Sequence, residues 1–357
     1  METKIITPTL PLAHAYTPPL FTVEPLLEVS KDAADDIELV DLDESEEVGL
    51  DEIEGDPSPK NTLNDLPGRV WIAETKSFWY QKGLGSKHPH AQIERQHPAP
   101  YSYQDVARLI RFFTKSGARV LDPFLGVGST LKACALTNRT GVGIDVTQQW
   151  ADLSRERLAF EVGEMALTTQ EVIHGDSRVV LSDTERFPNE SFDFAVCSPP
   201  YWSILTKKAD HKVKNERVLN GLATQYSDAE ADLGNVESYD DFLDQIGIVF
   251  NHVHRVLKPG KYFAIVVGDF RHKSKFIPYH SDIIRLLSTQ EVTLPFELHG
   301  ITLLIQNHKK LYPYGYPYAY VPNQHHQYIL IFRKPKTILS SPKKSKSLAK
   351  SEPQAKA

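Results

Sequence analysis

Leu121-Asp122-Pro123-Phe124-Leu125-Gly126-Val127-Gly128-Ser129-Thr130 is the stretch that decides the fold of this chain. Residues 119–121 form the short apolar run of a buried strand that ends at Asp122, and residues 129–136 are spaced as a helix. Gly126 and Gly128 between them let the backbone pass close to a ligand where any Cβ would clash. The pair lacks the rest of a GxGxxG fingerprint, so it predicts a strand–loop–helix unit without identifying the ligand.

Outward from this unit, strands and helices alternate along the chain. The expected strands share short apolar runs bounded by turn residues, and they cover residues 119–121, 141–144, 172–173, 192–196, 262–267, 301–305 and 328–332. The expected helices share apolar residues at helical spacing or a capping signal, and they cover residues 103–115, 129–136, 150–158 and 238–256. Gly117 is expected to end the first helix, and residues 258–260 the last. This alternation favours an α/β fold with a mainly parallel sheet and helices on both faces.

Polar residues follow four of the expected strands. They are Asp122, Asp145, Asp176 and Ser198. Ligands bind beyond the carboxyl ends of the strands in sheets of this kind, so we expect the four side chains to share one site. Asp145 lies 23 positions after Asp122 and is placed for the ribose hydroxyls of a nucleotide, as in dinucleotide-binding folds. That spacing alone leaves NAD and FAD open as ligands.

Five segments together resemble the motifs of DNA amino-methyltransferases. They are His97-Pro98-Ala99-Pro100-Tyr101, residues 122–130, Gly143-Ile144-Asp145, Gly175-Asp176 and Ser198-Pro199-Pro200-Tyr201, similar to motifs X, I, II, III and IV. The resemblance covers about residues 69–334, and its order X–I–IV departs from the permuted order common among methylases with a DPF-type motif I. It implies a Rossmann-like class I methyltransferase fold that depends on S-adenosylmethionine, with a seven-stranded, mainly parallel sheet and helices on both faces.

The resemblance also implies a cofactor site for S-adenosylmethionine. Its expected residues are Pro98, Asp122, Pro123, Phe124, Gly126, Gly128, Asp145 and Asp176. By that resemblance, Asp145 would bind the ribose and Asp176 the adenine amino group, while Pro98 would close over the methionine part. The loop residues from Asp122 to Gly128 would surround the methionine end.

The catalytic residues implied by motif IV are Ser198, Pro199, Pro200 and Tyr201. An exocyclic base amine is a poor nucleophile because its lone pair is conjugated into the ring, so it needs acceptors for its hydrogens. The Ser198 hydroxyl and the Pro199 carbonyl could serve, and the paired prolines would hold them rigidly. Tyr201 would stack on the base after it is flipped out of the duplex. Cys197 is adjacent, but without a Pro-Cys pair we expect it to be a small buried residue rather than a nucleophile for carbon methylation.

The choice of base follows from the first residue of motif IV. Among the enzymes that this chain resembles, Ser goes mainly with the N4 amine of cytosine, and Asp or Asn mainly with the N6 amine of adenine. We therefore expect site-specific methylation of cytosine N4 in double-stranded DNA, with adenine N6 as the alternative. An RNA methyltransferase and a catalytically inactive nucleic-acid-binding fold stay open as well. Enzymes of this kind belong to restriction–modification systems, so a cognate restriction endonuclease acting on the same site would be a partner.

Basic and aromatic residues near motif IV are candidates for DNA contact. Those expected to bind DNA are Trp202, Lys207, Lys208, Lys212, Lys214, Arg217, Arg271 and Lys273. All but Trp202 fall in two expected DNA-recognition loops, about residues 203–236 and 270–325, and Trp202 directly precedes the first. The second also contains Tyr312-Pro313-Tyr314-Gly315-Tyr316-Pro317-Tyr318, a stiff aromatic stretch that can either stack on bases or pack on the core.

Composition divides the chain into a catalytic domain, residues 61–335, and two tails that lack periodicity. Residues 24–56 hold 15 acidic residues and one lysine, so the N-terminal tail, residues 1–60, is expected to be acidic and disordered. The C-terminal tail, residues 336–357, is rich in Lys, Ser and Pro and is expected to be basic and disordered. Although the whole chain has a net charge of −6, the part after residue 56 is therefore positive, which suits a polyanionic substrate.

The two cysteines, Cys134 and Cys197, exclude a disulfide scaffold and a CxxC metal site. The histidine pairs, His88 with His90 and His325 with His326, are read as ordinary loop histidines, so no metal site is expected. Because the sequence has neither an apolar run of membrane-spanning length nor a leader pattern, we expect a cytoplasmic protein.

Overall fold

The structure is a computed structural model, and it describes residues 55–81, 88–202, 231–272, 275–288 and 295–336. Residues 1–54 of the expected acidic tail and 337–357 of the expected basic tail lie outside this part of the chain. The described residues from Glu47 onward belong to one compact unit. The expected disorder of the two tails therefore stays a prediction.

One eight-stranded sheet organises the described residues, with strand order β1-β9-β10-β6-β5-β2-β3-β4. Its strands are β1 (Phe78–Tyr80), β2 (Arg119–Asp122), β3 (Thr140–Asp145), β4 (Gln170–His174), β5 (Phe192–Cys197), β6 (Leu257–Val267), β9 (Glu297–Ile305) and β10 (His326–Arg333). β10 runs antiparallel to both neighbours, β6 and β9. The other pairs are parallel. The expected α/β class with a mainly parallel sheet is confirmed.

All seven expected strands are present, and the sheet has one strand more than we expected. The extra strand β1 has three residues and pairs in parallel with β9, with Phe78 opposite Leu303. A three-residue strand has too little pattern to be recognised, and its partner lies more than 200 residues away along the chain. A separate hairpin, β7 (Phe270–His272) and β8 (Lys275–Ile277), follows β6.

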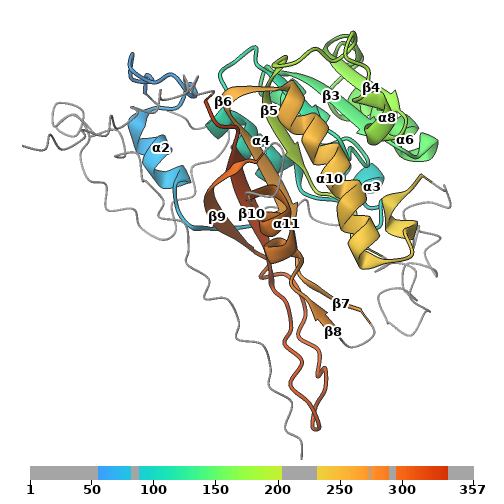
Figure 1. Cartoon of the computed structure of the whole chain (residues 1–357). Coiled ribbons are helices and arrows are strands. Elements are labelled where there is room, and N and C mark those ends of the chain that lie inside the picture. Colours follow the sequence, from blue (N-terminus) through green and yellow to red (C-terminus); the bar gives the residue numbers. More distant parts are fainter. Residues whose placement is uncertain (1–54, 82–87, 203–230, 273–274, 289–294, 337–357) are drawn as a thin grey trace, which may run out of the picture. The chain divides into compact units, whose positions relative to one another are not determined.

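Helices cover both faces of the sheet, as expected (Figure 1). They are α2 (Gly68–Glu74), α3 (Ala91–Glu94), α4 (Tyr103–Phe113), α5 (Ser129–Leu136), α6 (Gln148–Glu161), α7 (Ala166–Thr169), α8 (Ser177–Val180), η1 (Leu233–Asn235), α10 (Tyr239–Val256) and α11 (Tyr279–Ser288). One apolar core lies under α10 and α11 and includes Phe242 and Phe250, both fully buried. A second core lies under α4 and includes Val106 and Ile110. Among the described helices, none is long and apolar enough to cross a membrane.

Two helix boundaries differ from the prediction. α4 ends at Phe113, because Thr114 already has extended backbone angles, and Gly117 forms a later turn with φ +78°. β6 begins at Leu257, directly after α10, so residues 258–260 belong to the strand rather than to a break before it. The predicted cap of α10 is confirmed, since the Ser238 hydroxyl accepts a hydrogen bond from the Asp241 amide at 3.0 Å.

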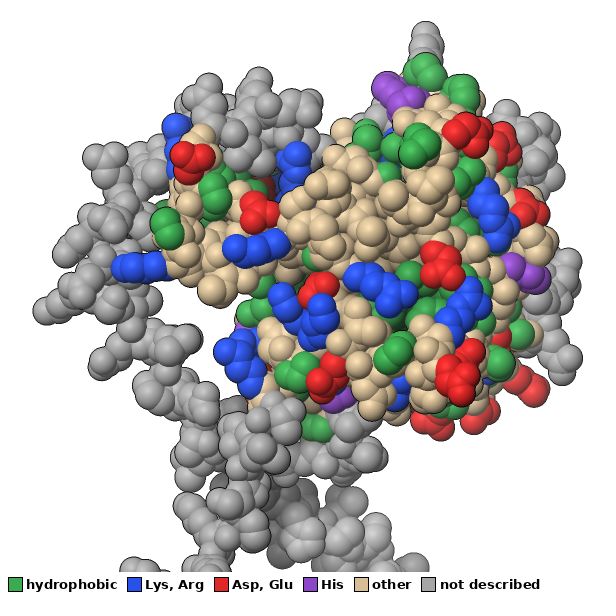
Figure 2. Space-filling view, turned by 90° about the horizontal axis from the view of Figure 1, so that it is seen from above, with side chains coloured by type: hydrophobic (Ala, Val, Ile, Leu, Met, Phe, Trp, Pro, Cys, Tyr) green, Lys and Arg blue, Asp and Glu red, His purple; other side chains and the backbone are tan. Residues whose placement is uncertain are grey.

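The second expected recognition segment, residues 270–325, is more regular than a loop. It contains β7, β8, α11 and β9, and its longest irregular described stretch is residues 306–325 between β9 and β10. Figure 2 views the molecule from above relative to Figure 1, and on that face Lys and Arg side chains alternate with Asp and Glu rather than forming one patch.

Candidate functional site

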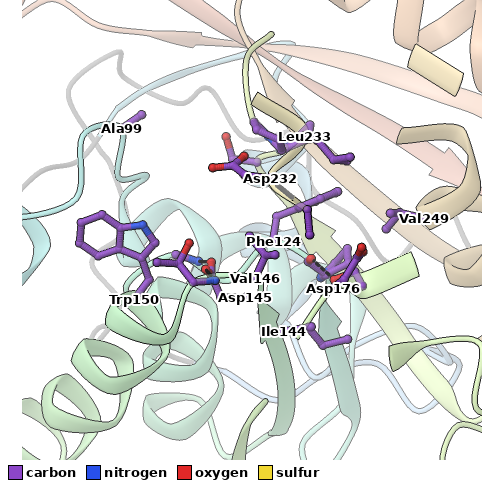
Figure 3. A pocket seen from close by; sticks show the side chains of 18 of the residues that line it. Ala99, Phe124, Ile144, Asp145, Val146, Trp150, Asp176, Asp232, Leu233 and Val249 are labelled. Carbon is purple, nitrogen blue, oxygen red and sulfur yellow. Dashed lines mark hydrogen bonds between the residues drawn. The ribbon is translucent and has the colours of Figure 1, made fainter. Parts of the chain in front are cut away.

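A pocket opens at the carboxyl ends of the parallel strands, where the sequence predicted a site. Its space is ≈ 680 Å³, a volume that includes the open mouth. Eight predicted site residues line it: Pro123, Phe124, Gly126, Asp145, Asp176, Ser198, Pro199 and Pro200. In Figure 3, Trp150 and Asp176 lie toward opposite ends of the pocket with Phe124 between them. The structure therefore brings the predicted cofactor motifs and motif IV into one cavity.

The glycine loop is tied to the end of the neighbouring strand. The Gly126 amide donates to Asp145 Oδ2 at 2.8 Å, and the Thr147 amide donates to Asp145 Oδ1 at 2.9 Å. Gly126 has φ +55° and Gly128 has φ +79°, a region that favours glycine. A Cβ on Gly128 would also lie 3.1 Å from the Ser154 Cβ. Both glycines are therefore required by the loop's backbone, and the loop holds Asp145 in place.

The charge state of Asp145 is set by its surroundings. Burial raises the pKa of its carboxyl to about 7, while the two backbone amides that bond it oppose the rise and Asp232 adds to it. Asp145 and Asp232 both line the pocket (Figure 3). This end of the pocket is consequently rich in hydrogen-bond acceptors and able to receive hydroxyl or amino donors.

Asp122 lies behind the loop and is not among the residues that line the pocket, so its expected contact with the cofactor stays a prediction. Its side chain is fully buried, and Oδ2 accepts hydrogen bonds from the Tyr101 hydroxyl at 2.6 Å and from the Thr130 hydroxyl. Oδ1 accepts from the Phe124 amide at 2.9 Å. Burial raises the pKa of Asp122 to about 6 despite these bonds. Asp122 therefore positions the loop and anchors the segment that carries Tyr101.

Gly128 and Pro98 also lie outside the pocket lining. Gly128 precedes the first residue of α5. Pro98 is flanked by His97 and Ala99, which do line the pocket. For both residues the structure assigns a place next to the cavity, and the contact with a cofactor stays a prediction.

A buried ionic network supports the loop from below. Arg157 donates to Glu161 Oε2 at 3.0 Å and to Glu94 Oε2 at 2.6 Å, and Lys132 reaches the same Glu161 oxygen at 2.6 Å. Arg157 also donates to the Val127 carbonyl at 3.2 Å. The side chains of Arg157 and Glu161 have no exposed surface. The network thus links α3, α5 and α6 to the loop, and periodicity alone would have assigned these charges to a solvated face.

Asp176 caps α8 and is held by an arginine. Arg178 donates to both Asp176 oxygens, at 3.0 Å from Nε and 2.6 Å from Nη2, and it also donates to the Ala231 carbonyl at 3.2 Å. Asp176 still lines the pocket, opposite Trp150 in Figure 3. The arginine fixes the carboxylate and at the same time joins it to the segment that carries Asp232.

Motif IV follows β5 directly, and its first three residues lie in the pocket. Ser198, Pro199 and Pro200 line the pocket. Among the described residues, no hydrogen bond uses the Ser198 hydroxyl. The Pro200 carbonyl accepts from the Tyr279 hydroxyl at 3.2 Å, which helps to fix the turn. Cys197 is fully buried at the end of β5, as expected, and burial raises the pKa of its thiol well above the ordinary value.

Tyr201, the aromatic residue of motif IV, is hydrogen-bonded and packed within the protein. The Tyr201 hydroxyl accepts from the Gly268 amide at 2.9 Å and from Gln327 Nε2 at 3.2 Å. Its ring lies against Phe270 and Tyr279. These contacts tie Tyr201 to β7, α11 and β10, and it is absent from the pocket lining. Its expected stacking on a base stays a prediction.

Trp202 is also engaged within the protein. Its Nε1 donates to the Val236 carbonyl at 2.9 Å, and its ring packs on His272 and Tyr239 with centroid distances of 4.4 and 5.3 Å. The expected DNA contact of Trp202 would have to compete with this packing.

Of the other residues expected to bind DNA, Arg271 is described, and it lies on β7 with its guanidinium 5.8 Å from the Phe276 ring centroid. The remaining six, Lys207, Lys208, Lys212, Lys214, Arg217 and Lys273, lie outside the described residues. Their roles stay predictions.

Several pocket residues were not predicted as site residues, among them three with polar or aromatic groups that could contact a ligand. His97, Trp150 and Asp232 line the cavity, and the His97 and Trp150 rings meet edge to face at 5.0 Å. Trp150 was read as part of a helical pattern, and Asp232 lies in a stretch that matches no motif with an assigned role. In the described part of the chain, no cluster of three or more His, Cys, Asp or Glu side chains could hold a metal ion.

The chain is similar to several known proteins, but only over short aligned stretches. The chain is 35% identical over 95 residues to the Type II methyltransferase M.MjaI of Methanocaldococcus jannaschii, which is 26% of this chain and 31% of the relative. It is 26% identical over 170 residues to the tRNA (guanine(10)-N2)-dimethyltransferase of Pyrococcus abyssi, which is 45% of this chain and 48% of the relative. The chain therefore spans less than half the length of either relative.

A solved structure from Thermus thermophilus, described as a DNA modification methylase complexed with S-adenosyl-L-methionine, is 26% identical to this chain. The match covers 47% of this chain and 57% of that chain, with a TM-score of 0.29. Because this TM-score is low, the fold is assigned from the order and directions of the strands in the sheet and not from this match.

The family is shown by a protein-family model that matches most of the chain. The model, described as DNA methylase and covering N6 and N4 enzymes, matches residues 22–156 and 192–357. These ranges include the glycine loop, Asp145 and motif IV, which meet in the pocket. The chain therefore belongs to the N6/N4 DNA methylase family.

Proposed function

We propose that this protein transfers a methyl group from S-adenosylmethionine to an exocyclic base amine in double-stranded DNA, with cytosine N4 as the acceptor. The observation that carries the proposal is the shared pocket, in which the glycine loop and Asp145 face the same cavity as Ser198 and Pro199. A cofactor site and an amine-binding turn in one cavity are what direct transfer between two bound molecules requires.

The pocket suits S-adenosylmethionine, the methyl donor of this family. Its apolar side chains, Phe124, Ile144 and Val146, provide flat surfaces for an adenine ring, and its carboxylates provide acceptors. In this assignment Asp145 receives the ribose hydroxyls, and Asp176 or Asp232 receives amino groups. When bound, the cofactor supplies an electrophilic methyl group on a positively charged sulfur.

The remaining chemistry belongs to the chain. The Ser198 hydroxyl and the Pro199 carbonyl accept hydrogens of the base amine, which localises the nitrogen lone pair for attack. Because Pro199 and Pro200 fix the backbone, these acceptors need little reorganisation as positive charge develops on the amine. The target base reaches them by leaving the duplex stack, which costs a few kcal/mol.

The preference for cytosine N4 depends on Ser198, because enzymes similar to this chain mainly use Ser at this position for cytosine. Adenine N6 is the alternative within the same mechanism. The test is methyl transfer from labelled S-adenosylmethionine to duplex DNA from a methylation-free host, followed by nucleoside digestion and mass spectrometry. N4-methylcytosine supports the whole proposal, N6-methyladenine overturns the base choice, and no methylated nucleoside overturns the proposed activity.

A second candidate substrate is RNA, favoured by the similarity to the Pyrococcus tRNA dimethyltransferase. The same assay with unmodified tRNA as acceptor distinguishes it, since an RNA enzyme would label tRNA and leave duplex DNA unlabelled. A catalytically inactive, nucleic-acid-binding protein would label neither. The similarity to the Type II methyltransferase M.MjaI supports a restriction–modification system as the setting of the proposed enzyme, and an endonuclease of the same site would then be its partner.

A further inference from the structure

An exposed aromatic segment joins the last two strands of the sheet. We define the tyrosine arm as residues 306–325, between β9 and β10. Figure 1 shows it projecting beyond the sheet in the same direction as the β7–β8 hairpin. Three of its tyrosines are almost fully exposed: Tyr316 at 80%, Tyr318 at 94% and Tyr320 at 87%. Such side chains add nothing to the core, so the alternative that this stretch packs on the core is excluded for them.

The arm has a fixed shape of its own. At its neck, the Tyr312 amide donates to Asn323 Oδ1 at 2.9 Å, and Asn323 Nδ2 donates back to the Tyr312 carbonyl at 2.8 Å. At its tip, the amides of Tyr318 and Ala319 both donate to the Gly315 carbonyl at 2.7 Å. Gly315 has φ +73°, and a Cβ there would lie 2.3 Å from the Ala319 carbonyl oxygen. The tyrosines are therefore presented by a closed hairpin.

The topology places the arm at the same end of the sheet as motif IV, where the parallel strands have their carboxyl ends. β9 runs parallel to β1 and antiparallel to β10, and β10 is antiparallel to β6, so β9 ends where β5 and β6 end. Two hydrogen bonds in series, through Gln327 on β10, connect the start of the arm to motif IV. Gln306 Nε2 at the start of the arm donates to Gln327 Oε1 at 3.1 Å, and Gln327 Nε2 donates to the Tyr201 hydroxyl at 3.2 Å.

The charge of the arm fits one class of partner. The sequence from residue 298 to residue 351 contains no Asp or Glu, and His308, Lys309 and Lys310 lie at the neck of the arm. On the face shown in Figure 2, by contrast, acidic and basic side chains are mixed. Exposed rings with basic neighbours and no carboxylate match nucleic acid, whose bases stack on aromatic rings and whose phosphates attract cations.

We infer that the tyrosine arm binds the substrate duplex beside the extruded base, with Tyr316, Tyr318 and Tyr320 stacking on bases and Lys309 and Lys310 contacting phosphates. This assignment rests on the proposed function for its choice of duplex DNA as the partner. The bond between Gln327 and Tyr201 gives the arm a fixed position relative to motif IV. Stacking at this position stabilises a duplex whose target base has rotated out of the base stack.

The test compares full-length variants that differ in ring content. The first replaces the three exposed tyrosines with Ala (Tyr316→Ala, Tyr318→Ala, Tyr320→Ala), and the second replaces the same three with Phe. The matched control is Phe160→Ala on α6, which removes a ring that is 66% exposed outside the arm. Duplex affinity is measured by the anisotropy of a fluorescein-labelled duplex of mixed sequence over a range of salt concentrations. Cofactor affinity is measured by calorimetry with S-adenosylmethionine, which also shows that each variant is folded.

The Ala variant is expected to lose about tenfold or more in duplex affinity, since one stacked base is typically worth that much. Its cofactor affinity and the slope of affinity against salt should stay unchanged, because no charge is removed. The Phe variant and Phe160→Ala should bind like the wild type. An Ala variant that binds duplex like Phe160→Ala overturns the inference. So does an Ala variant that loses a wild-type dimer in light scattering while its duplex affinity is unchanged, because the occupant is then a second copy.

Methyl transfer in the same proteins separates this inference from the proposed function. Wild-type protein that methylates duplex DNA, together with an Ala variant of unchanged affinity and rate, overturns the arm and leaves the proposed function standing. Wild-type protein that binds duplex through the arm but transfers no methyl group overturns the proposed function and supports the arm. Wild-type protein without duplex affinity overturns both.

Discussion

The Gly126 amide and the Asp145 carboxylate are joined by a hydrogen bond of 2.8 Å that connects the loop after β2 to the end of β3. Through this bond the backbone of the glycine loop and the acid proposed to bind ribose hold each other in place. Asp145 Oδ1 is fixed in addition by the Thr147 amide. The protein's own hydrogen bonds therefore hold this end of the proposed cofactor site, and burial raises the pKa of its carboxyl group to about 7.

We expect cofactor affinity to rise with pH because of Asp145. Its pKa is raised to about 7 by burial, so the carboxyl is mostly protonated at pH 6 and mostly ionised at pH 8. The ionised form is the better acceptor for ribose hydroxyls, and affinity should increase about tenfold over this window. Calorimetry with methylthioadenosine checks this, since that nucleoside has no group of its own that titrates there. In Asp145→Asn the affinity should be weaker and independent of pH; a pH dependence that survives would contradict the assignment.

Ser198→Ala should lower kcat about 100- to 1,000-fold, the usual range for removing one preorganised group that acts in the transition state. Cofactor affinity should stay within about twofold, because the proposed contacts of the hydroxyl are with the base amine. The assay is methyl transfer to duplex DNA, with calorimetry for the cofactor. Ser182→Ala, at an exposed serine, is the control and should leave both quantities unchanged. Normal turnover in Ser198→Ala would remove Ser198 from the mechanism.

Arg157→Met should destabilise the protein by about 3–5 kcal/mol, because Glu161 and Glu94 would lose a buried partner. Arg186→Met is the matched control: Arg186 pairs with Glu171 at 2.6 Å, but both side chains are about half exposed, so its loss should cost about 1 kcal/mol or less. Denaturant unfolding monitored by circular dichroism measures both. Equal effects in the two variants would contradict the prediction that the buried network contributes more to stability than an exposed ion pair.

Tyr201→Phe should lower stability by about 1–3 kcal/mol, since the buried Gly268 amide would lose its acceptor while the ring keeps its packing. Turnover should fall no more than the loss of folded protein explains. Tyr80→Phe, at an exposed ring on β1, is the control and should be neutral. A large fall in kcat without a change in stability would instead assign the Tyr201 hydroxyl to the reaction.

Much of the fold and part of the site could be predicted because their signals are local. The apolar runs before Asp122, Asp145 and Ser198 identify strands from a few neighbouring residues, and the glycines between Asp122 and Ser129 mark the loop. Parallel strands then place the ends of those strands at one edge, so the convergence of Asp145, Asp176 and Ser198 on one pocket followed from the pattern.

Other features depend on contacts that no local pattern encodes. The sequence placed Asp122 at the end of a strand, but it did not show that Tyr101 and Thr130 enclose the side chain behind the loop. The sequence showed Tyr201 as an aromatic ring of motif IV, but not that Gln327, which lies 126 residues away along the chain, bonds its hydroxyl. A sequence shows that a carboxyl or an aromatic ring is present; which partners surround it is decided by the packing of distant segments.

The sequence by itself thus determined the α/β fold, the edge of the sheet that carries the site and the motifs that belong to the N6/N4 DNA methylase family. Only the tertiary structure decided which side chains face the pocket and which support it from behind, and that Trp150 and Asp232 complete its walls. It also decided that the tyrosines of residues 306–325 are exposed rather than packed. The physical reason is that periodicity and turn chemistry act over a few residues, whereas burial is set by contacts between segments far apart in the chain.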